Sequence, residues 1–149
     1  MACNNGKSYQ KSCARYYNNN AQPLAANGQT MLTLAGARAV LTGEAIGVQP
    51  QSFDTTKIGL YHLTADAVIA ATAAGKATLV WMMDGVAIPC TVKTVTLAAD
   101  VNTEIHTETD LSLSACCCCV NHTFTLLAIT DETAAGSVVQ LCTGLLKLA

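Results

Sequence analysis

The chain has 149 residues and a formal net charge of −2, and its charged fraction of 12% is about half the roughly 25% that is usual in globular domains. Its Lys and Arg residues are scattered, so the basic face that nucleic-acid binding requires is missing, and no apolar run approaches the ~18 residues of a membrane helix. We therefore expect neither a nucleic-acid nor a membrane partner, and the polar start of the chain, which lacks the apolar core of a signal peptide, favours synthesis in a cytoplasm.

Residues 1–22 form a polar, aperiodic segment with almost no aliphatic side chains. Such a composition supplies no core, so we expect an extended N-terminal arm that is disordered alone or ordered only against a partner. Two interpretations remain open: the arm is simply a mobile terminus, or it is an anchor whose contacts come from Tyr16 and Tyr17. Residues 23–149 are expected to form the folded domain.

From residue 23 on, short runs of Thr, Val, Leu and Ile alternate with Gly, Asn and Asp, a pattern typical of β-strands joined by turns. The first short strands are expected over residues 30–34, 38–42 and 44–48. Two later segments, residues 60–69 and 104–114, alternate more clearly between their two faces. In the second of these, one face collects Glu, His, Asp and Ser, so we expect that face to lie against water.

Asp84-Gly85 predicts a hairpin, because Asp and Gly tolerate the positive φ angles of a two-residue type I′ turn. Such a loop pairs Met83 with Val86 and sets the register of both strands. The pairs that follow on one face are all apolar: Trp81 with Ile88, Leu79 with Cys90, and Ala77 with Val92. Pro89 cannot donate to the ladder, so its strand is expected to be an edge or to bulge there.

The last two expected strands, residues 123–129 and 138–148, are apolar on both faces. Strands of this kind are covered on both faces, but a small sandwich offers a core to only one, so the second face predicts a contact with another subunit. The candidate interface residues are Phe124, Leu126, Leu127, Ile129, Leu146 and Leu148. In all, about eight strands with short turns favour an all-β, antiparallel β-sandwich of the jelly-roll kind with an extended N-terminal arm.

Four consecutive cysteines, Cys116, Cys117, Cys118 and Cys119, are the most unusual chemical feature of the chain. Side chains alternate sides on a strand, so these thiolates cannot together close one tetrahedral zinc site. Three alternatives stay open. They are a metal site that takes further ligands such as His122 or Cys142, disulfides between chains, and small apolar thiols packed at a buried seam.

Two further patterns point only weakly to chemistry. His106-Thr107-Glu108 matches half of a zinc-deaminase motif, but the Pro-Cys-x-x-Cys half that should follow it is missing. Glu108 and Asp110 could pair as in a glycosidase, although their alternation with Thr favours a solvated strand face. No Gly-x-Ser-x-Gly elbow or phosphate-binding glycine loop occurs. The sequence therefore predicts no catalytic, cofactor-binding or metal-binding residues, and a protein that is not an enzyme.

Four short segments resemble, in order, the jelly roll of tumour-necrosis-factor-like and complement globular-head domains. They are Phe53-Asp54, Gly59-Leu60-Tyr61-His62-Leu63, Leu79 to Gly85, and Cys142-Thr143-Gly144-Leu145-Leu146. The likeness covers roughly residues 50–148 and implies a homotrimer without catalysis. Domains of this group are also similar to small bacteriophage proteins, among them capsid decoration proteins, head fibres and tail-fibre tips.

Two functions follow from this resemblance. The first is structural: a capsid decoration or head-fibre-like trimer on the virion surface, made in the host cytoplasm and attached through its N-terminal arm to a major capsid protein or another virion protein. The second is a receptor- or carbohydrate-binding module on the same trimeric fold. Binding modules of that kind usually present aromatic platforms in loops, and aromatic residues make up only 5% of this chain, which favours the structural role.

Overall fold

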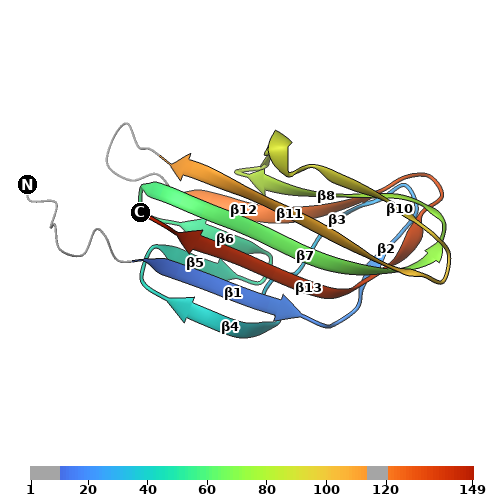
Figure 1. The fold of residues 1–149 in the computed structure, drawn as a ribbon, viewed down its shortest axis with the longest axis horizontal. Helices are drawn as coiled ribbons and strands as arrows, with labels where there is room; N and C mark the ends of the chain where they lie inside the picture. The colour runs from blue at the N-terminus through green and yellow to red at the C-terminus, as the bar shows by residue number, and fades with distance from the viewer. Residues whose placement is uncertain (1–10, 114–120) are drawn as a thin grey trace, which may run out of the picture.

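The computed structural model describes residues 11–113 and 121–149, and within them thirteen strands form two antiparallel sheets. Sheet A has the order β11-β7-β13-β1-β4, with β2 also on β13, and sheet B has the order β10-β8-β12-β6-β5, with β3 on β12 and β9 on β8. Figure 1 shows the five main strands of sheet A side by side in front of sheet B. Within the described residues, no helix is long and apolar enough to cross a membrane.

The strand bounds show how short several elements are. Sheet A contains β1 (Ser12–Asn18), β2 (Gln22–Leu24), β4 (Ala37–Thr42), β7 (Gly59–Ala73), β11 (Asn102–Leu113) and β13 (Ala135–Lys147). Sheet B contains β3 (Gln29–Met31), β5 (Ile46–Gln49), β6 (Ser52–Thr55), β8 (Gly75–Met83), β9 (Val86–Ala87), β10 (Lys93–Leu97) and β12 (His122–Thr130). Several of these strands lie end to end along one neighbour, which is why the structure has more strands than the eight or so predicted. The predicted fold class is confirmed.

The core fills the space between the two sheets, and the alternation read from the sequence is confirmed. The inward residues of β7, from Tyr61 to Ile69, are buried, and so are Ile105, Thr107 and Leu113 of β11. Four aromatic side chains are fully buried at the centre: Phe53, Tyr61, Trp81 and Phe124. Phe53 stacks on Trp81, with the two ring centroids 6.3 Å apart.

The predicted hairpin turn is confirmed, but the register beyond it is wrong. Asp84 and Gly85 both have positive φ, 52° and 82°, and Met83 pairs with Val86. After Ile88 the chain leaves the ladder through a short 3₁₀ helix, η2 (Pro89–Thr91), and rejoins β8 at Lys93, which faces Leu79. Cys90 was expected at that place.

The cause of this shift is Thr91. Its buried hydroxyl accepts a hydrogen bond from the Trp81 N–H at 3.0 Å and donates to the Ile88 carbonyl at 2.7 Å. The Thr91 side chain thus takes the place of a backbone partner for the Trp81 N–H of β8. The three residues of η2 lie outside the ladder, which shifts the register of the strand that follows. Pro89 lies in this irregular part of the edge, as its missing N–H predicted.

The structure also corrects the predicted boundary at residue 22. Residues 12–18 form β1, which lies inside sheet A between β13 and β4. Its polar side chains are satisfied by distant partners: the Ser12 hydroxyl accepts from the Ala45 N–H at 3.0 Å, and the Asn18 amide donates to the Thr33 carbonyl at 3.1 Å. Composition alone therefore suggested an arm where the fold has a strand. The rest of the predicted arm, residues 1–10, lies outside the described residues.

Candidate self-association surface

The outward side chains of sheet A form a surface that we call the sheet A face. Each row crosses the sheet from β11 through β7, β13 and β1 to β4, as the register requires. The row through the middle is Glu108, Thr64, Gly144, Arg15 and Val40. Neighbouring rows place charged and His residues over β11 and β7, and mainly apolar residues over β13, β1 and β4.

Four large apolar side chains stay exposed on or beside this face. Tyr17 is 41% exposed, Val40 38%, Leu60 39% and Leu148 37%. Leu60 and Leu148 are neighbours, because the Leu148 N–H donates to the Leu60 carbonyl at 2.7 Å. Tyr17 and Val40 lie on β1 and β4, while Leu60 and Leu148 lie together at the end of β7, so the face carries two separate apolar sites that another molecule could cover.

A ladder of alternating carboxylates and imidazoles crosses β7 and β11 on the same face. His62 Nδ1 lies 2.6 Å from Asp110 Oδ1, and His106 Nδ1 lies 2.5 Å from Asp66 Oδ1. The Nε2 atoms of both imidazoles approach one oxygen, Glu108 Oε2, at 3.4 and 3.5 Å. We call these five residues the His-carboxylate ladder.

The ladder favours a protonated imidazole at His106. Its Nδ1 faces the Asp66 carboxylate and so carries the hydrogen, which in a neutral ring leaves a lone pair on Nε2 facing the Glu108 carboxylate. A second proton turns that contact into an attraction. The hydrogen bond to Asp66 accordingly raises the pKa of His106, burial works against it, and the charges of Asp66 and Glu108 raise it further.

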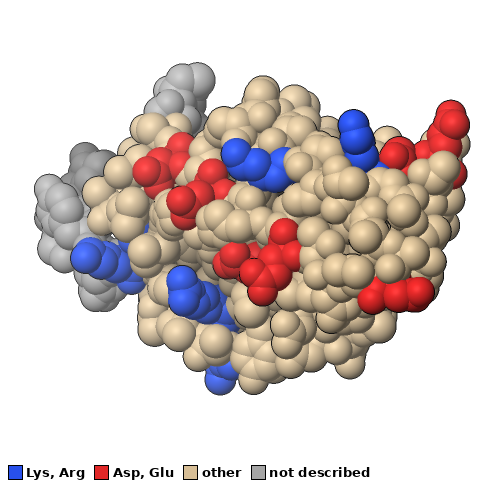
Figure 2. Space-filling view, turned by 45° about the vertical axis from the view of Figure 1, so that its right-hand side comes forward, with Lys and Arg blue, Asp and Glu red and all other residues tan. Residues whose placement is uncertain are grey.

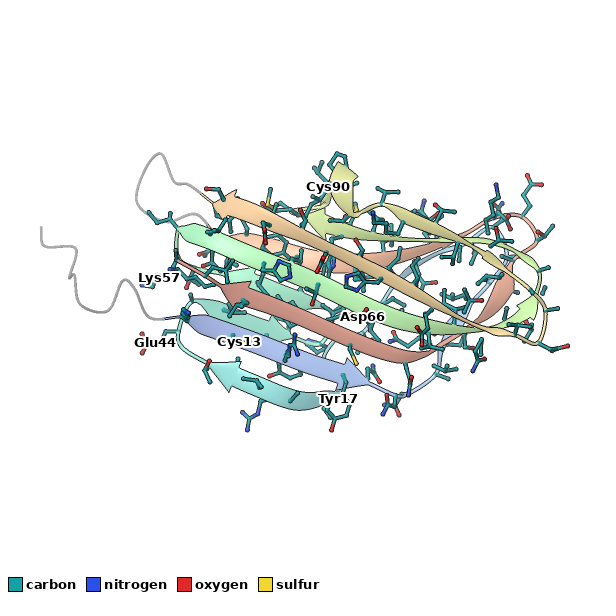
Figure 3. All side chains as sticks on the ribbon, viewed as in Figure 1. Cys13, Tyr17, Glu44, Lys57, Asp66 and Cys90 are labelled. Carbon is teal, nitrogen blue, oxygen red and sulfur yellow. The ribbon has the colours of Figure 1, made fainter. Side chains whose placement is uncertain are left out.

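A hollow of about 170 Å³ lies at the middle of the sheet A face, and its lining includes Arg15, Tyr17, Thr64, Asp66 and Cys142. Gly144, in the central row, adds no side chain between Thr64 and Arg15, where a Cβ would lie 3.3 Å from Thr64 Oγ1 and 3.4 Å from Arg15 Cγ. Figure 3 labels Tyr17 on β1 and Asp66 on β7, to either side of β13. Arg15 makes no ion pair with any residue that the structure describes.

The face therefore has two halves of different chemistry. The ladder supplies three carboxylates over β7 and β11, whereas the half over β13, β1 and β4 combines apolar side chains with the cationic Arg15. Figure 2 shows acidic side chains in small groups on the visible face, with Lys and Arg placed singly and most of the surface uncharged.

The six predicted interface residues do not share one surface. Phe124 and Leu126 are fully buried in the core of the single chain, so they have no surface to offer a partner. Leu127 and Ile129 are half-buried on the outer face of sheet B, while Leu146 and Leu148 belong to the sheet A face. One pair therefore lies on each face of the sandwich, and the six residues do not form the single interface patch that the sequence predicted.

The two predicted anchor residues also separate. Tyr16 points into the sandwich, where its ring lies 6.2 Å from that of Phe53. Tyr17 points outward on the sheet A face. Neither lies in a free arm, because both belong to β1.

The cysteine run at 116–119 lies outside the described residues. Among the described cysteines, Cys13, Cys90 and Cys142 form no disulfide. Cys142 faces the hollow, and Cys90 Sγ lies 3.1 Å from the Thr109 hydroxyl.

The third histidine ties the hairpin tip to β12. His122 Nδ1 lies 2.6 Å from Asp84 Oδ2, and Asp84 Oδ1 accepts from the Thr123 N–H at 2.8 Å. Burial works to raise the pKa of Asp84, but the hydrogen bonds from Thr123 and His122 together hold it below its usual value. These two contacts hold the turn against β12, and the His122 imidazole is paired with Asp84.

Sequence reasoning missed the His-carboxylate ladder. It placed Glu108 and Asp110 on a solvated strand face and did not connect them with His62. The signal that joins them is the pairing of β7 with β11, which sets His62 opposite Asp110 and Asp66 opposite His106. The alternation of each strand was visible, but their mutual register was not.

The two sheets and their strand order define a jelly-roll β-sandwich. No model of a known protein family matches the sequence, and no curated protein matches it either. Solved structures do share the fold. Murine APRIL at pH 5.0 has a TM-score of 0.64 at 11% identity, over 93% of this chain and 100% of that one.

Two more solved structures share this fold. The globular domain of zebrafish complement 1qA has a TM-score of 0.60 at 9% identity, covering 89% of this chain and 94% of that one. The vertex protein P5 of PRD1 has a TM-score of 0.55 at 17% identity, covering 93% and 73%. The fold is therefore the tumour-necrosis-factor-like and complement globular-head-like jelly roll that the sequence resembled.

Proposed function

We propose that this chain is a structural virion protein, a capsid decoration or head-fibre-like trimer at the virion surface, and that it acts without catalysis. The observation that carries the proposal is the sheet A face, which leaves four large apolar side chains exposed and also carries Arg15, a cation that has no ion pair among the described residues. The fold shared with the vertex protein P5 of PRD1 supports the virion setting.

Self-association would use the two halves of the sheet A face. When a twisted sheet turns one face towards a three-fold axis, each half of that face meets a different neighbour. The apolar half with Arg15 would then cover the His-carboxylate ladder of the next copy, so that every subunit pairs cation with carboxylate and buries its apolar side chains. The number three comes from the family resemblance.

Attachment would use the chain before β1. Because β1 begins at Ser12, the anchor would consist of the residues that precede it. Tyr17 would then contribute to the self-association surface and not to the anchor. The partner would be a major capsid protein or another virion protein, met after synthesis in the host cytoplasm.

Two measurements test the proposal. Sedimentation equilibrium of the purified full chain should give three times the chain mass of 15.5 kDa, and a stable monomer at micromolar concentration would overturn the trimer. A chain that starts at Lys11 should still assemble but should no longer bind capsids prepared without this protein. If that shortened chain decorates capsids as the full chain does, attachment through the N-terminal segment is wrong.

A further inference from the structure

A groove of about 510 Å³ lies on the outer face of sheet B, on the side of the sandwich away from the sheet A face. It arises because two short strands share one edge of β12: β6 pairs with residues 122–124 and β3 pairs with residues 127–129. Between them the outer surface is open around Thr125. The lining residues are Met31, Thr33, Gln49, Pro50, Gln51, Ser52, Thr123 and Thr125.

The lining is polar but uncharged. Six of the eight residues carry a hydroxyl or a carboxamide, and none carries a charge. The side chains of Gln49, Thr123 and Thr125 make no hydrogen bond to any residue that the structure describes, and Gln51 Nε2 makes only a long one, 3.4 Å, to the Met31 carbonyl. These donors and acceptors are free to bind a ligand.

Local hydrogen bonds hold the groove in shape. The Gln22 carboxamide accepts from the Thr33 N–H at 2.7 Å and donates to the Thr33 carbonyl at 3.0 Å. The Leu34 N–H donates to the Pro50 carbonyl at 2.8 Å, which joins the chain after β3 to the β5–β6 turn. The backbone at Thr33 is thus satisfied within the protein, and its hydroxyl remains available.

We propose that this groove binds a neutral oligosaccharide. Sugar hydroxyls both donate and accept, and so do the hydroxyl and carboxamide groups of the lining. Met31, which is 46% exposed, and Pro50 supply an apolar contact for the C–H face of a pyranose ring. The volume lies in the range of about 300–1,000 Å³ that is usual for small-molecule sites.

Other ligand classes fit less well. No Lys, Arg or His lines the groove, so an anionic ligand would find no counter-charge. An extended peptide would need an open strand edge. Both edges of β12 are already paired, with β8 on one side and β6 and β3 on the other, but β3 and β5 each pair with one strand only, so a neutral peptide is a comparison ligand in the test below. A purely apolar ligand would leave six polar side chains unpaired.

The binding is expected to be weak at each site. The groove contains no aromatic ring for stacking and no charged side chain, so we expect a dissociation constant of about 1 mM, which corresponds to roughly −4 kcal/mol. Repetition of the site in an assembly would strengthen attachment to a glycan-covered surface. The groove itself lies within one chain, so its ligand binding does not depend on the proposed trimer.

The test is a two-dimensional amide NMR titration of the full chain with glucose, galactose, mannose, N-acetylglucosamine and lactose, and with glucuronic acid and a neutral tetrapeptide as comparison ligands. We expect at least one neutral sugar to shift the resonances of Gln49, Gln51 and Thr125, and those of their neighbours. The double variant Gln49→Ala/Gln51→Ala should lose the shifts, and so should Thr125→Val, which removes only a hydroxyl.

The matched control is Gln140→Ala, which removes the same kind of exposed side chain from the sheet A face and should bind as the unaltered chain does. The same spectra report whether each variant is folded. The proposal is overturned if no neutral sugar shifts these resonances, if the acid or the peptide shifts them more strongly, or if the groove variants bind unchanged.

Discussion

Replacing Leu60 with glutamate would place a carboxylate on the proposed contact between subunits. Leu60 lies on the outward side of β7, next to Leu148 and in the row beside the His-carboxylate ladder. Its backbone bonds to Leu148 and Ala149 do not involve the side chain. Because the side chain is 39% exposed in the single chain, we expect the folded chain to lose no more than about 0.5 kcal/mol of stability.

The effect on assembly should be much larger. Full burial of a Leu side chain is worth about 2 kcal/mol, so covering the exposed part of Leu60 contributes roughly 0.8 kcal/mol at each contact. A new carboxylate without a cationic partner adds a desolvation cost of several kcal/mol. A total of about 3 kcal/mol per contact weakens each contact by more than about 100-fold.

The assay is sedimentation equilibrium of Leu60→Glu beside the unaltered chain and beside Val86→Glu. Val86 is 70% exposed at the hairpin tip and receives the same charge away from the sheet A face. We expect a monomer for Leu60→Glu, a trimer for the control, and similar thermal unfolding for both. Equal masses for the two variants would refute the placement of the contact on this face.

Three other predictions concern the fold and its titrating groups. A chain that starts at Pro23 lacks β1 and should show no cooperative unfolding by circular dichroism, whereas one that starts at Lys11 should unfold as the full chain does. The hydrogen bond to Asp66 raises the pKa of His106, so the stability it contributes is present below about pH 6.5 and is lost as the pH rises through the raised pKa. The urea midpoint should therefore fall between about pH 6 and pH 8, and less so in His106→Gln. Burial raises the pKa of Tyr61 to about 12, so ultraviolet titration should show one late phenolate step that disappears in Tyr61→Phe.

Those features that depend on one strand alone could be predicted from the sequence. The alternation in residues 60–69 and 104–113 was sufficient to assign their inward faces, because each strand has one face on the core and the period of two is unambiguous. The Asp84-Gly85 turn was equally local, since its residues tolerate the positive φ that the turn needs.

Features that depend on pairing between distant segments could not be predicted. The register after Pro89 failed because the Thr91 hydroxyl takes a ladder position that the pattern assigned to another residue. The strand β1 was taken for an arm because its polar residues find partners more than ten positions away in the chain, at Thr33 and Ala45. The His-carboxylate ladder was missed for the same reason, because it exists only in the register between β7 and β11.

The two candidate surfaces lie on opposite faces of one sandwich, and this placement links the two proposals. If the sheet A face turns towards a three-fold axis, the outer face of sheet B turns away from it. Each trimer would then present three grooves on its outside. Leu60→Glu should then retain the sugar-dependent NMR shifts of a single site while losing multivalent attachment to a surface coated with the same sugar. Loss of both would contradict the placement of the sugar site within a single chain, and retention of both would mean that attachment does not need the trimer.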